Sequence, residues 1–221
     1  MIPVCVLVVA KAPVPGLAKA RLAATVGDDT AAEIAAAALL DTLDAVAAGS
    51  VAARVVALTG ELDAAKCAGE IRSRLDDFIV IPQRGKDFAA RLANAHADAA
   101  AATGGLPVLQ IGMDTPQVSP ELIGSCARSL ADGDAVLGMA SDGGWWVLGI
   151  RDAAIADCLR GVPMSAPDTG AVTLAALRDT GVNVELLCEL ADVDTLDDVG
   201  PVRRVCPPGS RFSRLTATVG T

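Results

Sequence analysis

The chain has 221 residues, of which 52% are hydrophobic, with 18 lysines and arginines against 27 aspartates and glutamates. The resulting net charge of −9 argues against broad nucleic-acid binding, because that activity needs a basic surface. No apolar stretch reaches the about 18 residues of a membrane span, and the N-terminal run lacks the basic start and cleavage site of a signal peptide. A cytoplasmic location is therefore the default expectation.

Length favours one folded domain, which we place at residues 1–203. A basic tail is expected at 204–221, where three arginines occur without any acid, and a solvated tail is the simplest interpretation. The six cysteines form no C-x-x-C pair, so neither a disulfide framework nor a zinc site is predicted. The one histidine, His96, lies in a predicted helix and is expected to be a surface or packing residue.

Short apolar runs alternate along the chain with longer helix-like segments. Strands are predicted at 3–9, 53–59, 78–82, 107–112, 134–139, 145–150 and 183–189. Helices are predicted at 28–48, 62–75, 86–102, 119–132, 152–160, 168–180 and 195–203. This alternation indicates βαβ units, whereas the two runs within 134–150 are joined by a short turn and predict one antiparallel hairpin. The predicted fold class is α/β, a three-layer α/β/α Rossmann-like arrangement around a mainly parallel sheet.

The loop after the first predicted strand carries three cations, Lys11, Lys19 and Arg21, with Gly16 between them. Ligands of open α/β sheets bind at the carboxyl ends of the strands. Lysine offers phosphate a mobile point charge, arginine offers a planar fork, and glycine lets the backbone approach closely. The spacing is that of neither a P-loop nor G-x-G-x-x-G. We predict a phosphate-binding loop, the alternative being a basic surface loop.

Polar residues also follow three later strands. Asp114 comes directly after an apolar run and can coordinate Mg²⁺ or Mn²⁺, although an Asx turn is an equal alternative. Asp194 precedes a helix that it can cap, and a cap position also places its carboxylate near a strand end. Gln83 and Gly85 follow the third strand and are candidates for base or ribose contacts. Cations and carboxylates at one sheet edge predict a site for a phosphorylated ligand and a divalent metal.

A tight turn is predicted at Asp142, Gly143 and Gly144, followed by Trp145 and Trp146. Two glycines permit positive φ or close contact between backbone and ligand. The face of Trp145 can form the floor beneath a sugar or base, because aromatic faces pack on flat or apolar ligand faces. These residues are candidates for substrate binding, and the alternative is a hairpin turn with a buried tryptophan pair.

Four motifs occur together and in order: K-A-P-x-P-G-x-x-K-x-R-L from Lys11, G-x-D-T-P from Gly112, D-G-G from Asp142 and D-V-D-T from Asp192. With them the chain resembles a bacterial family of small glycosyltransferase-A-like proteins, labelled as uncharacterised or arsenosugar-biosynthesis-type glycosyltransferases. That family is related to the nucleotidyltransferases of molybdenum-cofactor and deazaflavin biosynthesis. The resemblance extends to about residue 203.

The resemblance implies a nucleotide-diphospho-sugar transferase-like fold of the GT-A type. It implies that the first loop surrounds the nucleotide phosphates, that Asp114 is a metal ligand and that Asp194 is a second one. The chain departs from the family pattern at Ala20, where threonine is common, and at Ser141, where an acid is common. It also has two tryptophans after the D-G-G motif where tyrosines are common.

Three functions are compatible with these features. The leading hypothesis is a metal-dependent glycosyltransferase that uses a nucleotide-activated sugar and a small-molecule acceptor, with Mg²⁺ or Mn²⁺ as cofactor and Asp142 as base. The first alternative is a nucleotidyltransferase, in which a phosphate monoester attacks a nucleoside triphosphate and pyrophosphate leaves. The second is a non-catalytic nucleotide-binding protein, since fold alone does not establish function. The oligomeric state is not encoded in any of these motifs.

Overall fold

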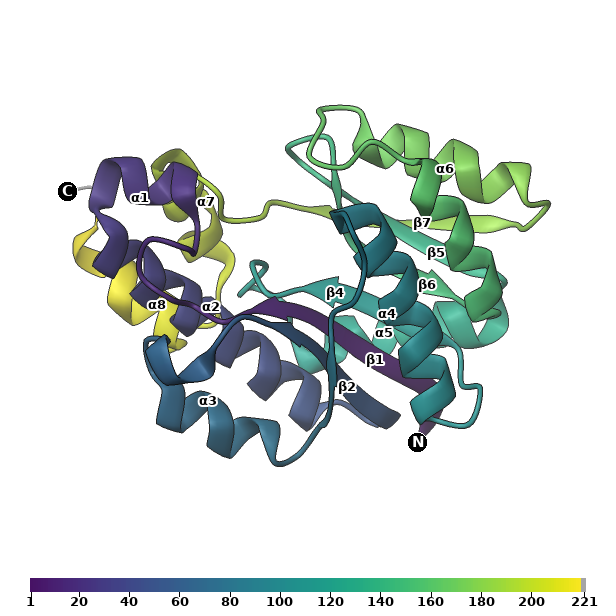
Figure 1. Cartoon of the computed structure of the whole chain (residues 1–221), viewed down its shortest axis with the longest axis horizontal. Helices are drawn as coiled ribbons and strands as arrows, with labels where there is room; N and C mark the ends of the chain where they lie inside the picture. Colours follow the sequence, from purple (N-terminus) through teal and green to yellow (C-terminus); the bar gives the residue numbers. More distant parts are fainter. Residues whose placement is uncertain (220–221) are drawn as a thin grey trace.

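The computed structural model describes residues 1–219, which contain a seven-stranded sheet with helices on both faces (Figure 1). The strands are β1 (Ile2–Lys11), β2 (Val51–Thr59), β3 (Ile79–Pro82), β4 (Val108–Gly112), β5 (Ala135–Ala140), β6 (Trp145–Ile150) and β7 (Val184–Leu190). The α-helices are α1 (Ala20–Val26), α2 (Asp28–Ala48), α3 (Ala68–Leu75), α4 (Phe88–Ala102), α5 (Pro120–Asp132), α6 (Thr169–Asp179), α7 (Leu196–Val205) and α8 (Arg211–Leu215). Three 3₁₀ segments are η1 (Leu62–Ala64), η2 (Ala153–Gly161) and η3 (Thr216–Thr218).

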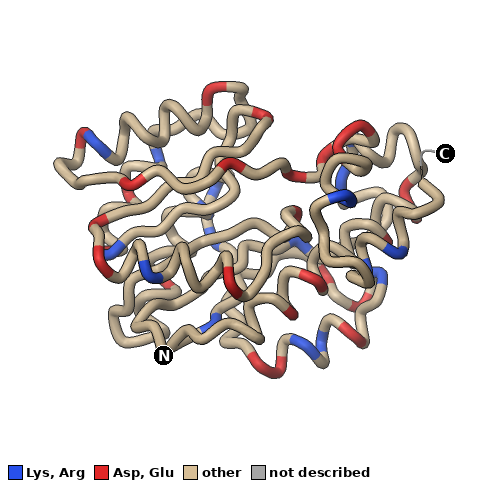
Figure 2. Tube along the Cα trace, turned by 180° about the vertical axis from the view of Figure 1, so that it is seen from behind, with Lys and Arg blue, Asp and Glu red and all other residues tan. Residues whose placement is uncertain are grey.

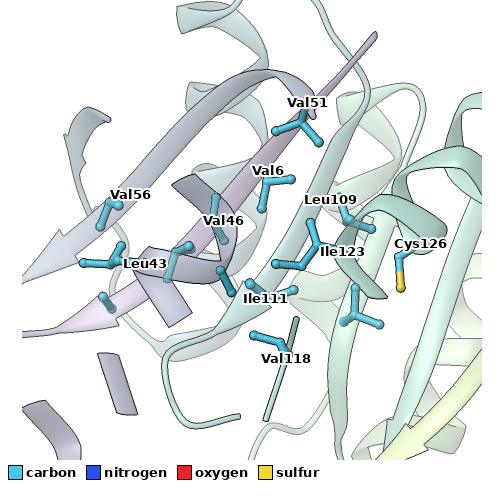
Figure 3. Close-up of a cluster of buried hydrophobic side chains, with 14 of the residues drawn as sticks. Val6, Leu43, Val46, Val51, Val56, Leu109, Ile111, Val118, Ile123 and Cys126 are labelled. Atoms are coloured by element: carbon cyan, nitrogen blue, oxygen red, sulfur yellow. The ribbon is translucent and has the colours of Figure 1, made fainter. Parts of the chain in front are cut away.

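The strand order is β3-β2-β1-β4-β6-β5-β7, and every pairing except those of β6 is parallel. The predicted three-layer α/β/α Rossmann-like fold with a mainly parallel sheet is therefore confirmed. Residues 4–10 of β1 are all buried, because helices cover both faces of this central strand. Figure 3 shows one of the two interfaces, where Leu43 of α2 and Ile123 of α5 pack against strand residues such as Ile111.

The predicted antiparallel hairpin is present as β5 and β6. Strand β6 runs antiparallel to both β4 and β5, whereas β5 is parallel to β7. Because Ile111 pairs with Val147, the turn at 141–144 lies beside the carboxyl end of β4. The hairpin therefore delivers its polar turn to the edge of the sheet at which parallel α/β folds bind ligands.

Helix α2 is the longest of the described helices, and it is rich in alanine. Its small side chains let it pack closely against β1 on one side and against α1, α3 and α8 on others. Two of its acids, Asp41 and Asp44, receive contacts from the C-terminal segment. Neither α2 nor any other helix within residues 1–219 has the length and apolar character needed to cross a membrane.

Two predicted helices differ from the structure, and one short helix of the structure was not predicted. The helix expected at 62–75 is interrupted by Cys67, which adopts a left-handed conformation with φ 54°, so that only Ala68–Leu75 is α-helical. The segment expected at 152–160 is a 3₁₀ helix. Residues 20–26 form a separate short helix, α1, because Gly27 with φ 85° turns the chain before α2 begins.

The C-terminal segment is folded in its described part, so the prediction of a solvated tail is wrong there. Phe212 of α8 is fully buried in a cluster that also contains Leu22 and Ile34. The backbone N–H of Phe212 donates to Asp41, and the guanidinium of Arg211 reaches Asp44 at 2.6 Å. The sequence signal that was missed is the aromatic residue within the basic run. Figure 1 shows α8 beside α2, far along the chain but adjacent in space.

The one histidine of the chain lies in helix α4, which packs on the other face of the sheet. His96 of α4 is fully buried, and neither ring nitrogen has a hydrogen-bond partner within residues 1–219. Burial lowers the pKa of His96 to about 3. The unfolded chain, with a histidine pKa of about 6.5, binds a proton below that pH that the folded chain does not bind until near pH 3. His96 therefore destabilises the fold progressively as the pH falls through this window.

Between pH 7.5 and pH 5, His96 should cost the protein about 2 kcal/mol of unfolding free energy, since one pKa unit corresponds to about 1.4 kcal/mol. Urea unfolding of the wild type and of His96→Leu at the two pH values measures this cost. The variant should lose about 2 kcal/mol less than the wild type on acidification. An equal loss in both proteins would mean that the imidazole is charged or hydrated inside the fold.

Candidate functional site

A pocket of about 420 Å³ lies at the carboxyl ends of β1 and β4 and beside the β5–β6 turn. Nine of the residues proposed from the sequence line it: Lys11, Lys19, Arg21, Gln83, Asp114, Asp142, Gly144, Trp145 and Asp194. Three other proposed residues, Gly16, Gly85 and Gly143, are not among its lining residues. The volume falls within the range of small-molecule sites, which is roughly 300–1,000 Å³.

Lys19 lies at the centre of the charged wall of this pocket. Its ammonium group donates to Asp114 Oδ2 and to Asp194 Oδ1, each at 2.8 Å, and its side chain is 11% exposed. Lys19 adopts a left-handed conformation with φ 48°, immediately before α1. Burial alone would lower the pKa of Lys19, but the two carboxylates outweigh it and hold that pKa above its usual range. The lysine is therefore charged and links two segments distant in sequence.

Three carboxylates, those of Asp114, Asp192 and Asp194, meet beside the lysine. One oxygen from each lies within 4.8 Å of the others, and all three residues are partly buried. A backbone bond from Val193 N–H to the carbonyl of Asp114, 3.1 Å long, joins the β7–α7 connection to the loop after β4. Figure 2 shows acidic positions along that extended connection. Oxygen donors in this number suit a hard divalent cation such as Mg²⁺ or Mn²⁺.

Asp192 and Asp194 have opposite electrostatic environments. Burial and the neighbouring carboxylates of Asp114 and Asp142 raise the pKa of Asp192 to about 6. Burial also disfavours ionised Asp194, but Lys19 and Arg21 outweigh it and lower the pKa of Asp194. Of the three clustered carboxylates, Asp192 is thus the one that has no cationic partner within residues 1–219. Its motif was recognised in the sequence, but the residue was not assigned a role, because nothing local distinguishes it from Asp194.

Asp194 does not cap helix α7, because Thr195 and Asp198 do so. Asp198 accepts from the backbone N–H groups of Asp194 and Thr195, and Thr195 is the N-cap of α7 in a capping box. The side chain of Asp194 is consequently directed to Lys19 and Arg21 instead of to the helix terminus.

The carboxylate of Asp114 requires a glycine at position 112 for steric reasons. A Cβ at Gly112 would lie 2.5 Å from Asp114 Oδ1, so any larger residue would displace that carboxylate. Thr115, next along the loop, is 1% exposed and its hydroxyl has no hydrogen-bond partner within residues 1–219. The loop after β4 is therefore shaped around the carboxylate of Asp114.

The other two cations of the first loop are more exposed than Lys19. Lys11 donates to the carbonyl of Leu17 at 2.6 Å, which folds the loop back on itself. Arg21 donates to Asp194 Oδ2 at 2.6 Å, with its side chain 66% exposed. Gly16 has φ 76° and serves the turn of the loop. Both cations line the pocket. Each could give up its present hydrogen bond and bind a phosphate instead.

The β5–β6 turn is fixed against the start of α6. Gly143 has φ 90°, and a Cβ there would lie 1.8 Å from the carbonyl oxygen of Pro167, while the Gly143 carbonyl accepts from Gly170 N–H at 2.8 Å. Asp142 Oδ1 accepts from Gly144 N–H at 2.7 Å. The role of Gly143 in the structure is thus close packing, whereas Asp142 and Gly144 line the pocket.

The two tryptophans have separate positions. Trp146 is 3% exposed. Its indole N–H donates to the carbonyl of Cys188, so this side chain links β6 to β7. It also reaches the pocket wall. Trp145 is partly buried and lines the pocket as proposed. The buried-pair interpretation therefore describes Trp146 better than Trp145.

Gln83 and Gly85 have structural roles that the sequence did not reveal. The Gln83 amide donates to the carbonyls of Ala10 and Ala57, at 2.8 and 2.9 Å, and so ties the ends of β1 and β2 together. Gly85 has φ 147°, and a Cβ there would lie 2.8 Å from the backbone nitrogen of Arg91 in α4. Gln83 still presents part of its side chain to the pocket, and Gly85 does not.

Solved structures share this architecture. A candidate nucleotide-diphospho-sugar transferase from Desulfovibrio desulfuricans G20 matches with a TM-score of 0.83 and 26% identity, covering 97% of this chain and 94% of that one. A cytidylyltransferase from Leptospira borgpetersenii serovar Hardjo-bovis matches at 0.61 and 12% identity, covering 99% and 94%. Rv0371c of Mycobacterium tuberculosis H37Rv, in complex with manganese, matches at 0.54 and 18% identity, covering 90% and 97%.

The last two similarities are similarities of fold alone. No curated protein matches the chain in sequence. The resemblance to glycosyltransferase-A-like proteins and their nucleotidyltransferase relatives is confirmed by the fold and by the first of these structures. The family described as uncharacterized protein conserved in bacteria, DUF2064, matches residues 42–166, which is more than half of the chain. The chain therefore belongs to the DUF2064 family.

Proposed function

We propose that this protein is a metal-dependent transferase acting on a nucleotide-linked substrate, with glycosyl transfer from a nucleotide-activated sugar as its reaction. One observation carries the proposal: three carboxylates and a buried lysine converge in a pocket at the carboxyl edge of the sheet. Support comes from the similarity to the structure named as a candidate nucleotide-diphospho-sugar transferase and from the manganese in the Rv0371c structure.

Asp114, Asp192 and Asp194 would hold the Mg²⁺ or Mn²⁺. When bound, the metal supplies charge neutralisation for a diphosphate leaving group. Lys19 shares the carboxylates of Asp114 and Asp194, so its ammonium group would become available to the phosphates if those carboxylates held a divalent cation. Lys11 and Arg21 at the pocket mouth add two further donors. This arrangement stabilises negative charge as it develops on the departing nucleoside diphosphate.

The acceptor side of the pocket is formed by the β5–β6 turn. Asp142 uses Oδ1 to accept from Gly144 N–H, while Oδ2 has no hydrogen-bond partner within residues 1–219. We assign that oxygen the removal of a proton from an acceptor hydroxyl. Gly144 and Trp145 line the same wall and would contact the sugar or the acceptor.

A second function is favoured by a specific observation. Besides the proposed metal, four cations line the pocket: Lys11, Lys19 and Arg21 of the first loop and Arg91 of α4. A triphosphate fits that number better, and the cytidylyltransferase with the same fold uses nucleotidyl chemistry by its name. In that reaction a phosphate monoester attacks the α-phosphorus and pyrophosphate leaves.

Product analysis distinguishes the proposals. Purified protein is incubated with Mn²⁺ or Mg²⁺, nucleotide-sugars or nucleoside triphosphates, and pools of hydroxyl and phosphate-monoester acceptors. Release of nucleoside diphosphate supports glycosyl transfer, and release of pyrophosphate supports nucleotidyl transfer. Metal-dependent binding without either product, measured by calorimetry, would indicate a non-catalytic nucleotide-binding protein. No binding of any nucleotide with either metal would overturn the proposed function.

A further inference from the structure

Strand β4 contains one buried polar side chain whose presence the fold does not explain. Gln110 lies in the middle of this strand and is 2% exposed. Its parallel neighbour on β1 is Leu7, and its antiparallel neighbour on β6 is Leu148. Side chains alternate along a strand, so Gln110 shares the face of Val108 and not that of Ile111. It is therefore a carboxamide placed in an apolar layer.

The carboxamide of Gln110 has no hydrogen-bond partner within residues 1–219. Its Oε1 is inaccessible and unpaired, and its Nε2 donates to no group of this part of the chain. The amide nitrogens of two other glutamines are paired: Gln83 donates to two carbonyls, and Gln117 donates to the carbonyl of Ala191, although Oε1 of Gln117 is also buried and unpaired within residues 1–219. An unpaired buried amide is costly, so a group outside the chain is needed to satisfy it.

Gln110 lines the same pocket as the carboxylates and lysine of the charged wall. Four other residues that line the pocket belong to the apolar layer: Val9, Leu92, Trp145 and Met164. Gln110 precedes Gly112, at the end of β4, by two residues, or about 6.6 Å of strand. A ligand whose phosphates bind at the strand ends can therefore reach Gln110 with the base of its nucleoside.

We infer that Gln110 recognises the hydrogen-bonding edge of the nucleobase of the nucleotide substrate. This inference rests on the proposed function. Because Oε1 is the inaccessible atom, Nε2 is the atom that can meet a ligand, and its N–H groups complement an acceptor atom on the edge of a base. Flat apolar walls suit the faces of a heteroaromatic ring.

A sugar fits this part of the pocket less well. Its several hydroxyls each need a partner, and two of the polar side chains that line the pocket are already engaged. Thr169 donates to the carbonyl of Pro163 and accepts from Ala166 N–H, and both N–H groups of Gln83 are used by strand carbonyls. One unpaired carboxamide among apolar side chains matches a base that has one polar edge and two apolar faces.

The test compares nucleoside triphosphates with inorganic tripolyphosphate, which carries the charge without the base. Binding of ATP, CTP, GTP, UTP and tripolyphosphate is measured by calorimetry in the presence of Mn²⁺ for the wild type and for Gln110→Met. Methionine has a similar shape and removes both hydrogen-bonding atoms. The variant should bind the preferred nucleotide at least about tenfold more weakly and tripolyphosphate within about twofold of the wild type. Its melting temperature should be equal or higher, because an unpaired amide is lost.

Gln117→Met is the matched control, since Gln117 is also a buried glutamine but does not line the pocket. It should change the affinities for nucleotide and tripolyphosphate by the same factor. The inference is overturned if Gln110→Met keeps the affinity for every nucleotide or if it weakens tripolyphosphate equally. Wild-type protein that binds tripolyphosphate as tightly as any nucleotide would also overturn it, while leaving the proposed phosphate and metal site intact. Wild-type protein that binds none of the five probes would overturn this inference, whereas the proposed function is overturned only if nucleotide-sugars fail to bind as well.

Discussion

Replacing Lys19 with methionine is expected to lower the free energy of unfolding by about 2–3 kcal/mol in the absence of divalent metal. Loss of one partner from a fully buried ion pair costs about 3–5 kcal/mol, and the value here is smaller because Asp114 is 33% exposed. The substitution leaves three close carboxylates without the ammonium group that separates them. Chemical denaturation monitored by circular dichroism measures the loss.

Divalent metal should reverse that loss. Mn²⁺ at about 100 times its dissociation constant adds about 2.7 kcal/mol of stability, and in Lys19→Met it no longer competes with an ammonium group. The variant should therefore gain more stability from Mn²⁺ than the wild type gains. Lys86→Met is the matched control, because Lys86 is exposed and lies outside the pocket. A Lys19→Met protein with wild-type stability and wild-type metal response would show that the lysine and the metal do not share these carboxylates.

Asp114→Asn is expected to reduce metal-dependent nucleotide affinity by at least about 100-fold. Disruption of groups that merely orient a metal ligand costs about 10–100-fold, so the neutralisation of a ligand should cost no less. Asparagine keeps the size of the side chain and therefore the contact with Gly112. Calorimetric titration of nucleotide with and without Mn²⁺ measures the effect, which should be confined to the metal-dependent component.

Asp132→Asn provides the control for Asp114→Asn. Asp132 is an exposed aspartate at the end of α5 and does not line the pocket. Its variant should bind metal and nucleotide as the wild type does. If Asp114→Asn also keeps its metal-dependent affinity, Asp114 is not a ligand, and its carboxylate serves to position Lys19.

Much of the fold could be predicted because its signals are local. The run at Val108–Gly112 is apolar except for Gln110, short and followed by a turn, which is sufficient to indicate a buried strand. The same holds for the hairpin of β5 and β6, where the turn at 141–144 leaves no room for a crossover helix. Where local signals were absent, the prediction failed: nothing in the sequence around Cys67 indicates a left-handed residue that ends one helical segment and starts another.

The site was predictable only in part, since its decisive contacts are not local. Lys19 and Asp194 are separated by 175 positions, and the salt bridge between them depends on how the sheet orders its strands. The sequence placed both residues at strand ends but gave no means of pairing them. Asp192 and Gln110 were missed for related reasons. The first matters through its neighbours in space, and the second through its lack of a partner.

The separation of Lys19 from Asp194 also bears on biosynthesis. The cationic loop after β1 is synthesised long before Asp192 and Asp194, which are followed by the helix whose Phe212 closes the adjoining cluster. A nascent chain therefore contains the cationic loop long before it contains its acidic counterpart. Contacts between such distant segments also slow folding, because the loop entropy is lost before the contacts form. The cluster of three carboxylates is thus complete only after Asp194 has been synthesised, and a product truncated before Asp192 lacks two of its three members.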